Sequence, residues 1–130
     1  MPKKVKLDLS DIPDLAQTIA VSCLGLGIEC ELTGLRTLKI KETDRLEALK
    51  KEFKKLGANQ VKTSNNSIYF KGDQQLSNNI KINTYQDHRM ALSFATLAVI
   101  IDISIESPNV VSKSFPSFWQ NLKTLGFEIN

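Results

Sequence analysis

Acidic and basic residues that could bind anions and move protons stand in four short segments of the 130-residue chain. Arginine binds carboxylates and phosphates through two parallel hydrogen bonds, and lysine binds them as a point charge. A carboxylate beside such cations can accept or donate a proton. These residue types therefore favour chemistry on a negatively charged substrate. The residues are Asp14, Lys41, Glu42, Arg45, Asp87, His88, Arg89 and Lys113.

Each of these segments lies at or just before the start of a predicted helix. Apolar residues at helical spacing predict the helices, and short alternating runs predict the strands between them. The expected helices span 14–26 and 41–56, with a third beginning near Met90 and a fourth near Phe115. The expected strands span 5–8, 28–32, 59–63, 67–71 and 80–83.

The chain contains an internal repeat. Residues 5–8 match 80–83 at an offset of 75, and the same offset aligns Thr18 with Ser93. At an offset of 69, the apolar face of the second helix aligns with that of the fourth. Self-similarity at a nearly fixed spacing indicates a repeated structural unit. We expect a βαβαββ unit over residues 1–74 and a βαβαβ unit over residues 75–130.

The repeat predicts where the polar residues lie in space. Right-handed βαβ crossovers place successive helices side by side and pointing the same way on one face of a sheet. Their amino termini then open on a common edge, where free N–H groups and the helix dipole favour anions. Basic residues at the same edge indicate a shared anionic ligand that carries phosphate or carboxylate groups.

Composition limits the classes of protein to which this chain can belong. Seventeen basic and 14 acidic residues give a net charge of +3, which by itself favours neither nucleic acid nor a membrane surface. A hydrophobic content of 42% is typical of a globular α/β domain. The longest uncharged stretch, 90–101, is too short to span a bilayer, and no signal peptide is expected at the start. Two cysteines, Cys23 and Cys30, are compatible with a reducing cytoplasm.

Several of these residues also have simpler interpretations. Asp14 could complement the dipole in a first helical turn, and Arg45 could pair with Asp44 or Glu42 at the surface. The single histidine, His88, could be structural. It is the coincidence of four basic groups and several acids on one edge that favours a functional site.

Four motifs carry a family resemblance. They occur in one order along the chain and together span residues 12–119. They resemble the signature segments of the 5-enolpyruvylshikimate-3-phosphate synthase family, in the order and with the spacing of that family. The motifs are Ile12-Pro13-Asp14 with Thr18, Lys41-Glu42-Thr43-Asp44-Arg45, Tyr85-Gln86-Asp87-His88-Arg89-Met90-Ala91, and Lys113-Ser114-Phe115-Pro116 with Phe118-Trp119.

The resemblance implies an α/β (α+β) fold of repeated βαβαββ units, the inverse-barrel fold of enolpyruvyl transferases. The 130 residues would form about two of the three units of the carboxy-terminal domain. The amino-terminal domain of the same enzyme would be missing. The family transfers the enolpyruvyl group of phosphoenolpyruvate to the 5-hydroxyl of shikimate-3-phosphate and releases phosphate. It is a cytoplasmic shikimate-pathway transferase that needs no cofactor, no metal, no nucleic acid and no membrane.

The resemblance also implies roles for individual residues. Asp14 would bind shikimate-3-phosphate and act on its 5-hydroxyl, which Lys41 would contact. Glu42 would protonate the methylene carbon, a role that Lys41 could share. Arg45 and Arg89 would clamp the phosphoenolpyruvate carboxylate. Further residues complete the implied site: Lys113 with Arg89 at the phosphate, Asp87 and His88 behind the binding groups, and Thr37 where many members carry asparagine or histidine.

Two other hypotheses remain open. The chain could be a stand-alone anion- or nucleic-acid-binding repeat module, or a purely structural repeat protein. Nucleic-acid surfaces interleave aromatic with basic residues, whereas Phe53, Phe94 and Phe118 stand here at positions with the spacing of a helix core.

We expect the isolated chain to be catalytically inactive, because the reaction needs cations on both sides of the substrates.

Overall fold

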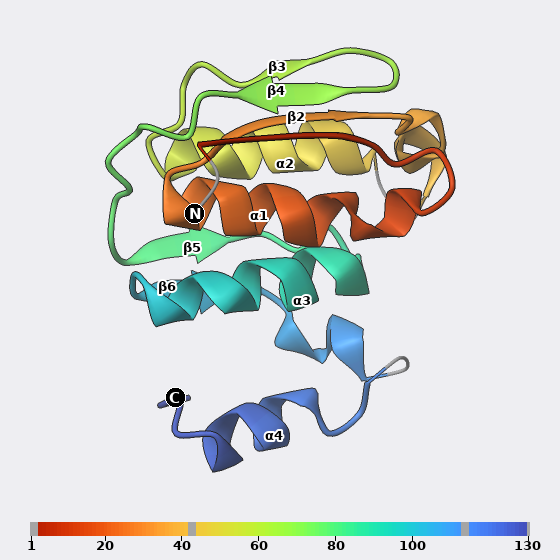
Figure 1. The fold of residues 1–130 in the computed structure, drawn as a ribbon. Helices are drawn as coiled ribbons and strands as arrows, with labels where there is room; N and C mark the ends of the chain where they lie inside the picture. Colours follow the sequence, from red (N-terminus) through yellow and green to blue (C-terminus); the bar gives the residue numbers. More distant parts are fainter. Residues whose placement is uncertain (1–2, 42–43, 113–114, 130) are drawn as a thin grey trace.

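A computed structural model of the chain describes residues 3–41, 44–112 and 115–129. Strands and helices alternate through most of it (Figure 1). The strands are β1 (Lys4–Asp8), β2 (Glu29–Thr33), β3 (Lys62–Thr63), β4 (Ile68–Phe70), β5 (Ile80–Ile82) and β6 (Ile103–Ile105). The α-helices are α1 (Ala16–Leu26), α2 (Arg45–Lys55), α3 (His88–Ala95) and α4 (Phe118–Thr124). Short 3-10 segments are η1 (Pro13–Leu15), η2 (Arg36–Ile40), η3 (Thr96–Val99) and η4 (Pro108–Val111).

Both halves of the described chain contain a parallel βαβ crossover. In the first, β1 and β2 pair in parallel around α1, with Val5 opposite Cys30. In the second, β5 and β6 pair in parallel around α3, with Ile80 opposite Ile103. The paired residues of the second crossover are two residues closer in sequence than those of the first. Because side chains alternate with a period of two along a strand, this difference keeps equivalent side chains on the same face of the sheet. The unit boundary at residues 74 and 75 stays a prediction.

The halves differ after the crossover. The first half adds the antiparallel pair β4 and β3, which completes a four-stranded sheet in the order β1-β2-β4-β3. The second half has only the pair β5-β6, and residues 125–129 form no strand. The expected βαβαβ pattern is therefore wrong at its last element. Residues 59–61 also lie outside β3, so the strand expected over 59–63 is only two residues long.

The first two predicted helices begin later as α-helices than the apolar pattern indicates, whereas α3 begins at His88, two residues before Met90. The first starts with the 3-10 turn η1, in which Pro13 occupies an early position that needs no backbone donor, and becomes α-helical at Ala16. Gly27, in the left-handed conformation at φ 71°, ends α1 as predicted. The second helix begins at Arg45 rather than residue 41, because the Asp44 side chain accepts a hydrogen bond from the Glu47 amide and caps it.

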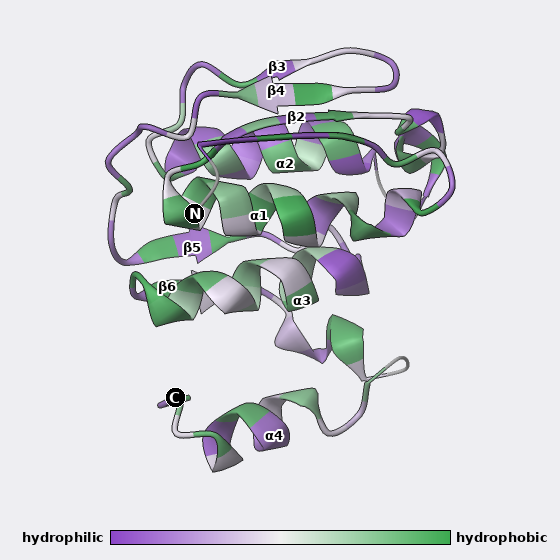
Figure 2. Ribbon diagram, in the orientation of Figure 1, coloured by the Kyte–Doolittle hydropathy of each residue, from purple (hydrophilic) through white to green (hydrophobic). Residues whose placement is uncertain are grey.

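One hydrophobic core joins the helices to the sheets. Phe53 of α2 makes edge-to-face ring contacts with Phe70 of β4, at 5.3 Å between centroids, and with Phe94 of α3, at 5.8 Å. All three rings are fully buried. Figure 2 shows that α1 is apolar along most of its length, whereas α2 mixes apolar and hydrophilic stretches. Among the described helices, none is long and apolar enough to cross a bilayer.

The helices point the same way, as the crossover geometry predicts. In Figure 1 the four α-helices all run from the right to the left of the view. Thr18 of α1 and Ser93 of α3, which occupy equivalent positions of the repeat, share a hydrogen bond of 3.2 Å between their hydroxyl oxygens. Contacts of Arg45 with Asp14 and Asp87 bring the starts of α1, α2 and α3 together, and the polar motifs converge there.

Candidate active site

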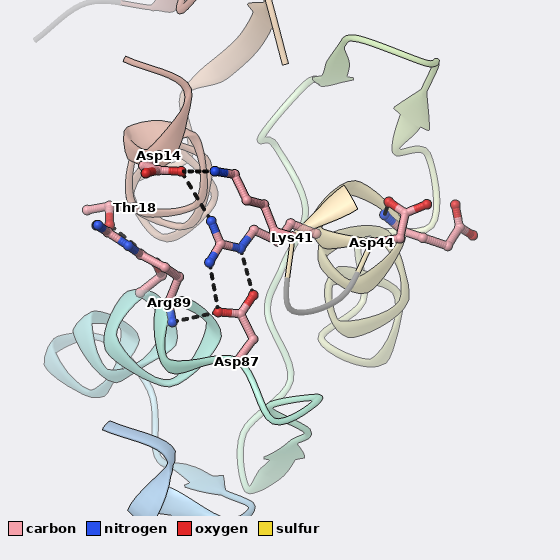
Figure 3. A network of polar contacts seen from close by, with 9 residues as sticks. Asp14, Thr18, Lys41, Asp44, Asp87 and Arg89 are labelled. Atoms are coloured by element: carbon pink, nitrogen blue, oxygen red, sulfur yellow. Dashed lines mark hydrogen bonds and ion pairs between the residues drawn. The ribbon is translucent and has the colours of Figure 1, made fainter. Parts of the chain in front are cut away.

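Three segments that are far apart in sequence meet at the amino-terminal ends of α1, α2 and α3. Asp14 comes from η1, Lys41 follows η2, Arg45 is the first residue of α2, and Asp87 precedes α3 (Figure 3). The predicted common edge is confirmed for these residues, since they contact one another directly.

Arg45 and Asp87 form a buried ion pair at the centre of this cluster. The Arg45 Nε donates to Asp87 Oδ2 at 2.8 Å, and its Nη2 donates to Asp87 Oδ1 at 3.2 Å. The side chains are 3% and 0% exposed. A bidentate pair of this kind is strong and directional. The sequence also suggested a surface contact of Arg45 with Asp44 or Glu42. Asp44 instead faces Lys39, with 3.4 Å between the charged atoms.

A third contact extends the ion pair to α1. The Arg45 Nη1 donates to Asp14 Oδ1 at 3.2 Å, so one guanidinium group links the starts of all three helices. Asp87 in turn accepts the Arg89 amide at 2.9 Å and caps α3. Arg45 and Asp87 therefore hold the three helix ends in fixed positions relative to one another.

Two further cations, Lys41 and Arg89, lie around this centre and are less tightly held than Arg45. The Lys41 Nζ is 3.8 Å from Asp14 Oδ1, and these side chains are 37% and 46% exposed. The half-buried guanidinium of Arg89 has no hydrogen bond or ion pair to any residue that the structure describes. In Figure 3 its side chain extends away from the Asp87 carboxylate, on the side of Thr18.

The charges of the cluster favour an anion. Among the described residues, the cluster holds three cationic side chains, Lys41, Arg45 and Arg89, and two carboxylates, Asp14 and Asp87, so its cations outnumber its acids beside the amino-terminal ends of the helices. The Asp14 side chain also faces Lys41 and is 46% exposed, so part of its carboxylate is open to a ligand. An exposed carboxylate beside an ammonium group can exchange a proton with a bound hydroxyl.

The remaining predicted residues are placed differently. His88 is half-buried at the first position of α3, and Thr37 is exposed on η2. Glu42 and Lys113 lie outside the described residues. Within the described part of the chain, no group of three or more histidine, cysteine, aspartate or glutamate side chains is placed to hold a metal ion.

Sequence reasoning did not identify one further polar cluster beside this site. The side chain of Glu52, in the last turn of α2, is 1% exposed and accepts hydrogen bonds from the segment that leads to Asp87. In the sequence Glu52 stands among four lysines, a pattern typical of a solvated helix face. Its spacing of seven residues from Arg45, two helical turns on the same face, is the feature that could have revealed it.

Comparison with known proteins agrees with the motifs. The family model described as EPSP synthase (3-phosphoshikimate 1-carboxyvinyltransferase) matches residues 2–122. A 3-phosphoshikimate 1-carboxyvinyltransferase of Bacteroides fragilis is 48% identical over 126 residues, which cover 94% of this chain and 30% of that protein. The enzyme of the same name from Laribacter hongkongensis is 37% identical over 123 residues, covering 95% of this chain and 28% of the relative.

A solved structure agrees as well. The EPSP synthase of Acinetobacter baumannii superposes with a TM-score of 0.69 at 27% identity, over 94% of this chain and 28% of that one. The chain thus spans about 30% of the length of the curated relatives that it matches. Because the family match covers nearly the whole sequence and includes every segment of the polar cluster, the chain belongs to the EPSP synthase family.

Proposed function

We propose that this chain forms one wall of the active site of an enzyme that transfers the enolpyruvyl group of phosphoenolpyruvate to the 5-hydroxyl of shikimate-3-phosphate. The observation that carries the proposal is the meeting of Asp14, Lys41 and Arg89 around the Arg45–Asp87 pair, in a chain of this family. The enzyme is a transferase of aromatic biosynthesis and works in the cytoplasm without a cofactor.

The reaction proceeds by addition and elimination. The 5-hydroxyl oxygen attacks the substituted carbon of the enol, the methylene carbon gains a proton, and the hydroxyl proton is lost. The tetrahedral intermediate then loses a proton from its methyl group and expels phosphate, so that the double bond is restored. Each step needs a proton donor or acceptor beside a cationic environment for phosphate and carboxylate groups.

Asp14 and Lys41 are assigned to the hydroxyl. The Asp14 carboxylate is open enough to reach a substrate, and the Lys41 ammonium 3.8 Å away stabilises the alkoxide that develops when the proton leaves. Glu42, next to Lys41 in sequence, is assigned as the acid for the methylene carbon. Lys41 shares that role in the same proposal.

The arginines are assigned to phosphoenolpyruvate. Arg89 is the main contact for the phosphoenolpyruvate carboxylate, because the residue is half-buried and its guanidinium has no partner among the described residues. Arg45 contributes positive charge from behind, since Asp87 and Asp14 already accept from three of its nitrogens. Lys113 joins Arg89 at the phosphate, while Asp87, His88 and Thr37 surround the site.

Kinetics of the whole protein test the assignment. We expect Arg89→Ala to raise the KM for phosphoenolpyruvate by a factor equivalent to about 2–5 kcal/mol, because it removes the partner of a desolvated anion. Glu42→Gln should mainly lower kcat, since it removes a proton donor but keeps the shape. An Arg89→Ala protein with unchanged dependence on phosphoenolpyruvate would contradict the assignment.

The isolated 130 residues provide the complementary test. We expect no phosphate release above the buffer blank when they are mixed with phosphoenolpyruvate and shikimate-3-phosphate, because cations on the opposite side of the substrates come from another part of the protein. Turnover that is lost in Asp14→Ala would show that one wall suffices. Oligonucleotide binding with a steep salt dependence would instead favour a nucleic-acid-binding module.

A further inference from the structure

The connection between β5 and α3 contains an unusual turn. The Asp87 amide donates to the Thr84 carbonyl at 2.8 Å, and the two residues between them, Tyr85 and Gln86, have φ values of 56° and 58°. Two successive left-handed residues are typical of a type I′ turn, where glycine and asparagine are preferred. Neither stands here, so the turn is strained and needs support from outside.

Glu52 of α2 provides that support. Its Oε1 accepts the Asn83 amide at 2.9 Å, and its Oε2 accepts the Tyr85 hydroxyl at 2.5 Å. A single buried carboxylate therefore binds the residue before the turn and the first left-handed residue within it. Burial and the bond to Glu52 both raise the pKa of Tyr85, so its hydroxyl stays a donor throughout the neutral range.

A lysine completes the support. The Lys55 Nζ lies 2.5 Å from Glu52 Oε1 and also donates to the Lys81 carbonyl at 2.8 Å. Residues 81, 83 and 85 are thus all held by the last turn of α2, while Asp87 is held by Arg45 at its start. Both ends of this segment are anchored to one face of one helix.

We propose that Glu52 and Tyr85 are positioning residues, which hold the strained turn so that Asp87 and Arg89 are aimed into the site. The turn ends at Asp87, whose carboxylate fixes Arg45 and caps α3, and Arg89 follows two residues later. A turn released from Glu52 would move both groups together. The inference rests on the proposed function for its kinetic test but not for its structural one.

The chain offers a matched control. The Tyr69 hydroxyl of β4 donates to Glu29 Oε2 of β2 at 2.5 Å, the same bond with the same length. It lies on neighbouring strands and makes no contact with the turn. Tyr69→Phe therefore removes a tyrosine–carboxylate hydrogen bond of the same length, to a more exposed acceptor, on strands outside the turn.

Tyr85→Phe in the whole protein tests the proposal. We expect the KM for phosphoenolpyruvate to rise about tenfold and the KM for shikimate-3-phosphate to change by less than about twofold, since Asp14 is not on the turn. Exchange of the Arg89 amide, which donates to Asp87, should become about tenfold faster. Tyr69→Phe should alter none of these values.

A rescue variant separates positioning from ordinary stabilisation. Glycine adopts φ 58° without strain, so Gln86→Gly in the Tyr85→Phe background should restore both the KM for phosphoenolpyruvate and the Arg89 exchange rate to within about threefold of the parent. A general loss of stability would affect the KM values for both substrates, whereas release of the turn should affect only the KM for phosphoenolpyruvate. If Tyr85→Phe fails to fold, Gln86→Gly with Glu52→Gln serves as the test, with the same expected recovery relative to Glu52→Gln alone.

The possible outcomes are distinct. Equal increases in both KM values without rescue would overturn the proposal, and so would an unchanged Arg89 exchange rate in Tyr85→Phe. A parent protein that does not turn over phosphoenolpyruvate would contradict the proposed function alone. In that case faster Arg89 exchange with glycine rescue would still support the positioning role, and its absence would overturn it.

Discussion

Helices α2 and α4 share a sequence pattern but differ in what covers them. At an offset of 69 their apolar faces align residue by residue. In the first helix every member of the face is 0% exposed. In the second region none of the aligned apolar residues is buried, and two are 41% and 76% exposed. The aligned residues are Leu46, Leu49, Phe53 and Leu56, and then Phe115, Phe118, Leu122 and Leu125.

The difference follows from the neighbouring elements. Phe53 of α2 meets rings from β4 and α3, so its helix is packed from two sides. Among the described residues, the ring of Phe118 in α4 contacts only rings of its own segment, those of Phe115 and Trp119. In the described part of the second half, no strands correspond to β3 and β4, and a cleft of about 500 Å³ lies between α4 and β6. Periodicity thus determines which face of a helix is apolar, whereas the partner elements decide whether that face is buried.

Truncating the two aligned core positions should give the largest contrast. We expect Phe53→Ala to lower the free energy of unfolding by about 3–5 kcal/mol, because it empties the fully packed junction of α2, β4 and α3. Leu122→Ala, at the equivalent position of α4, should cost about 1 kcal/mol or less. Urea denaturation of the 130-residue chain measures both. Equal losses would show that α4 is as well packed as α2.

The ion pair between α2 and α3 should give the next effect. We expect Asp87→Asn to cost about 1.5–3 kcal/mol, because the buried guanidinium of Arg45 loses the charge of its bidentate acceptor. The control is Asp44→Asn, which keeps the cap of α2 and removes only an exposed contact with Lys39, at a cost of about 0.5 kcal/mol. No side-chain hydrogen bond caps α4, and we expect neither substitution to change the stability of that helix. Similar losses in both variants would mean that the buried pair contributes no more than a surface contact.

The smallest effect concerns the order in which the regions unfold. Trp119 of α4 is the single tryptophan of the sequence, so its fluorescence reports on that helix alone. We expect its transition in urea to precede the far-ultraviolet circular dichroism transition by about 1 M, because few buried contacts hold α4. Phe53→Ala should move the second transition toward the first. Coincident transitions in the parent chain would indicate one cooperative unit.

Much of the site was predictable from residue types and order. The repeat predicted parallel crossovers, and these in turn predicted that Asp14, Lys41, Arg45 and Asp87 would meet at one edge. The structure confirms that meeting through direct contacts. The pattern could not reveal that Arg45 is held by Asp87 rather than free for a ligand, because the two lie 42 residues apart and pair only when α2 and α3 are packed together.

The sequence by itself determined the apolar faces, the crossovers, the motifs and the family, because periodicity, punctuation by glycine and proline, and motif order are local properties of the chain. Only the tertiary structure decided which of these features are buried and which charges are already paired. Burial turned Glu52 from one acid in a lysine-rich helix into the anchor of a strained turn, and left the matching face of α4 exposed. The physical reason is that the dielectric surroundings and hydrogen-bond partners of a side chain depend on elements distant in sequence, and these are set only when the helices and sheets pack.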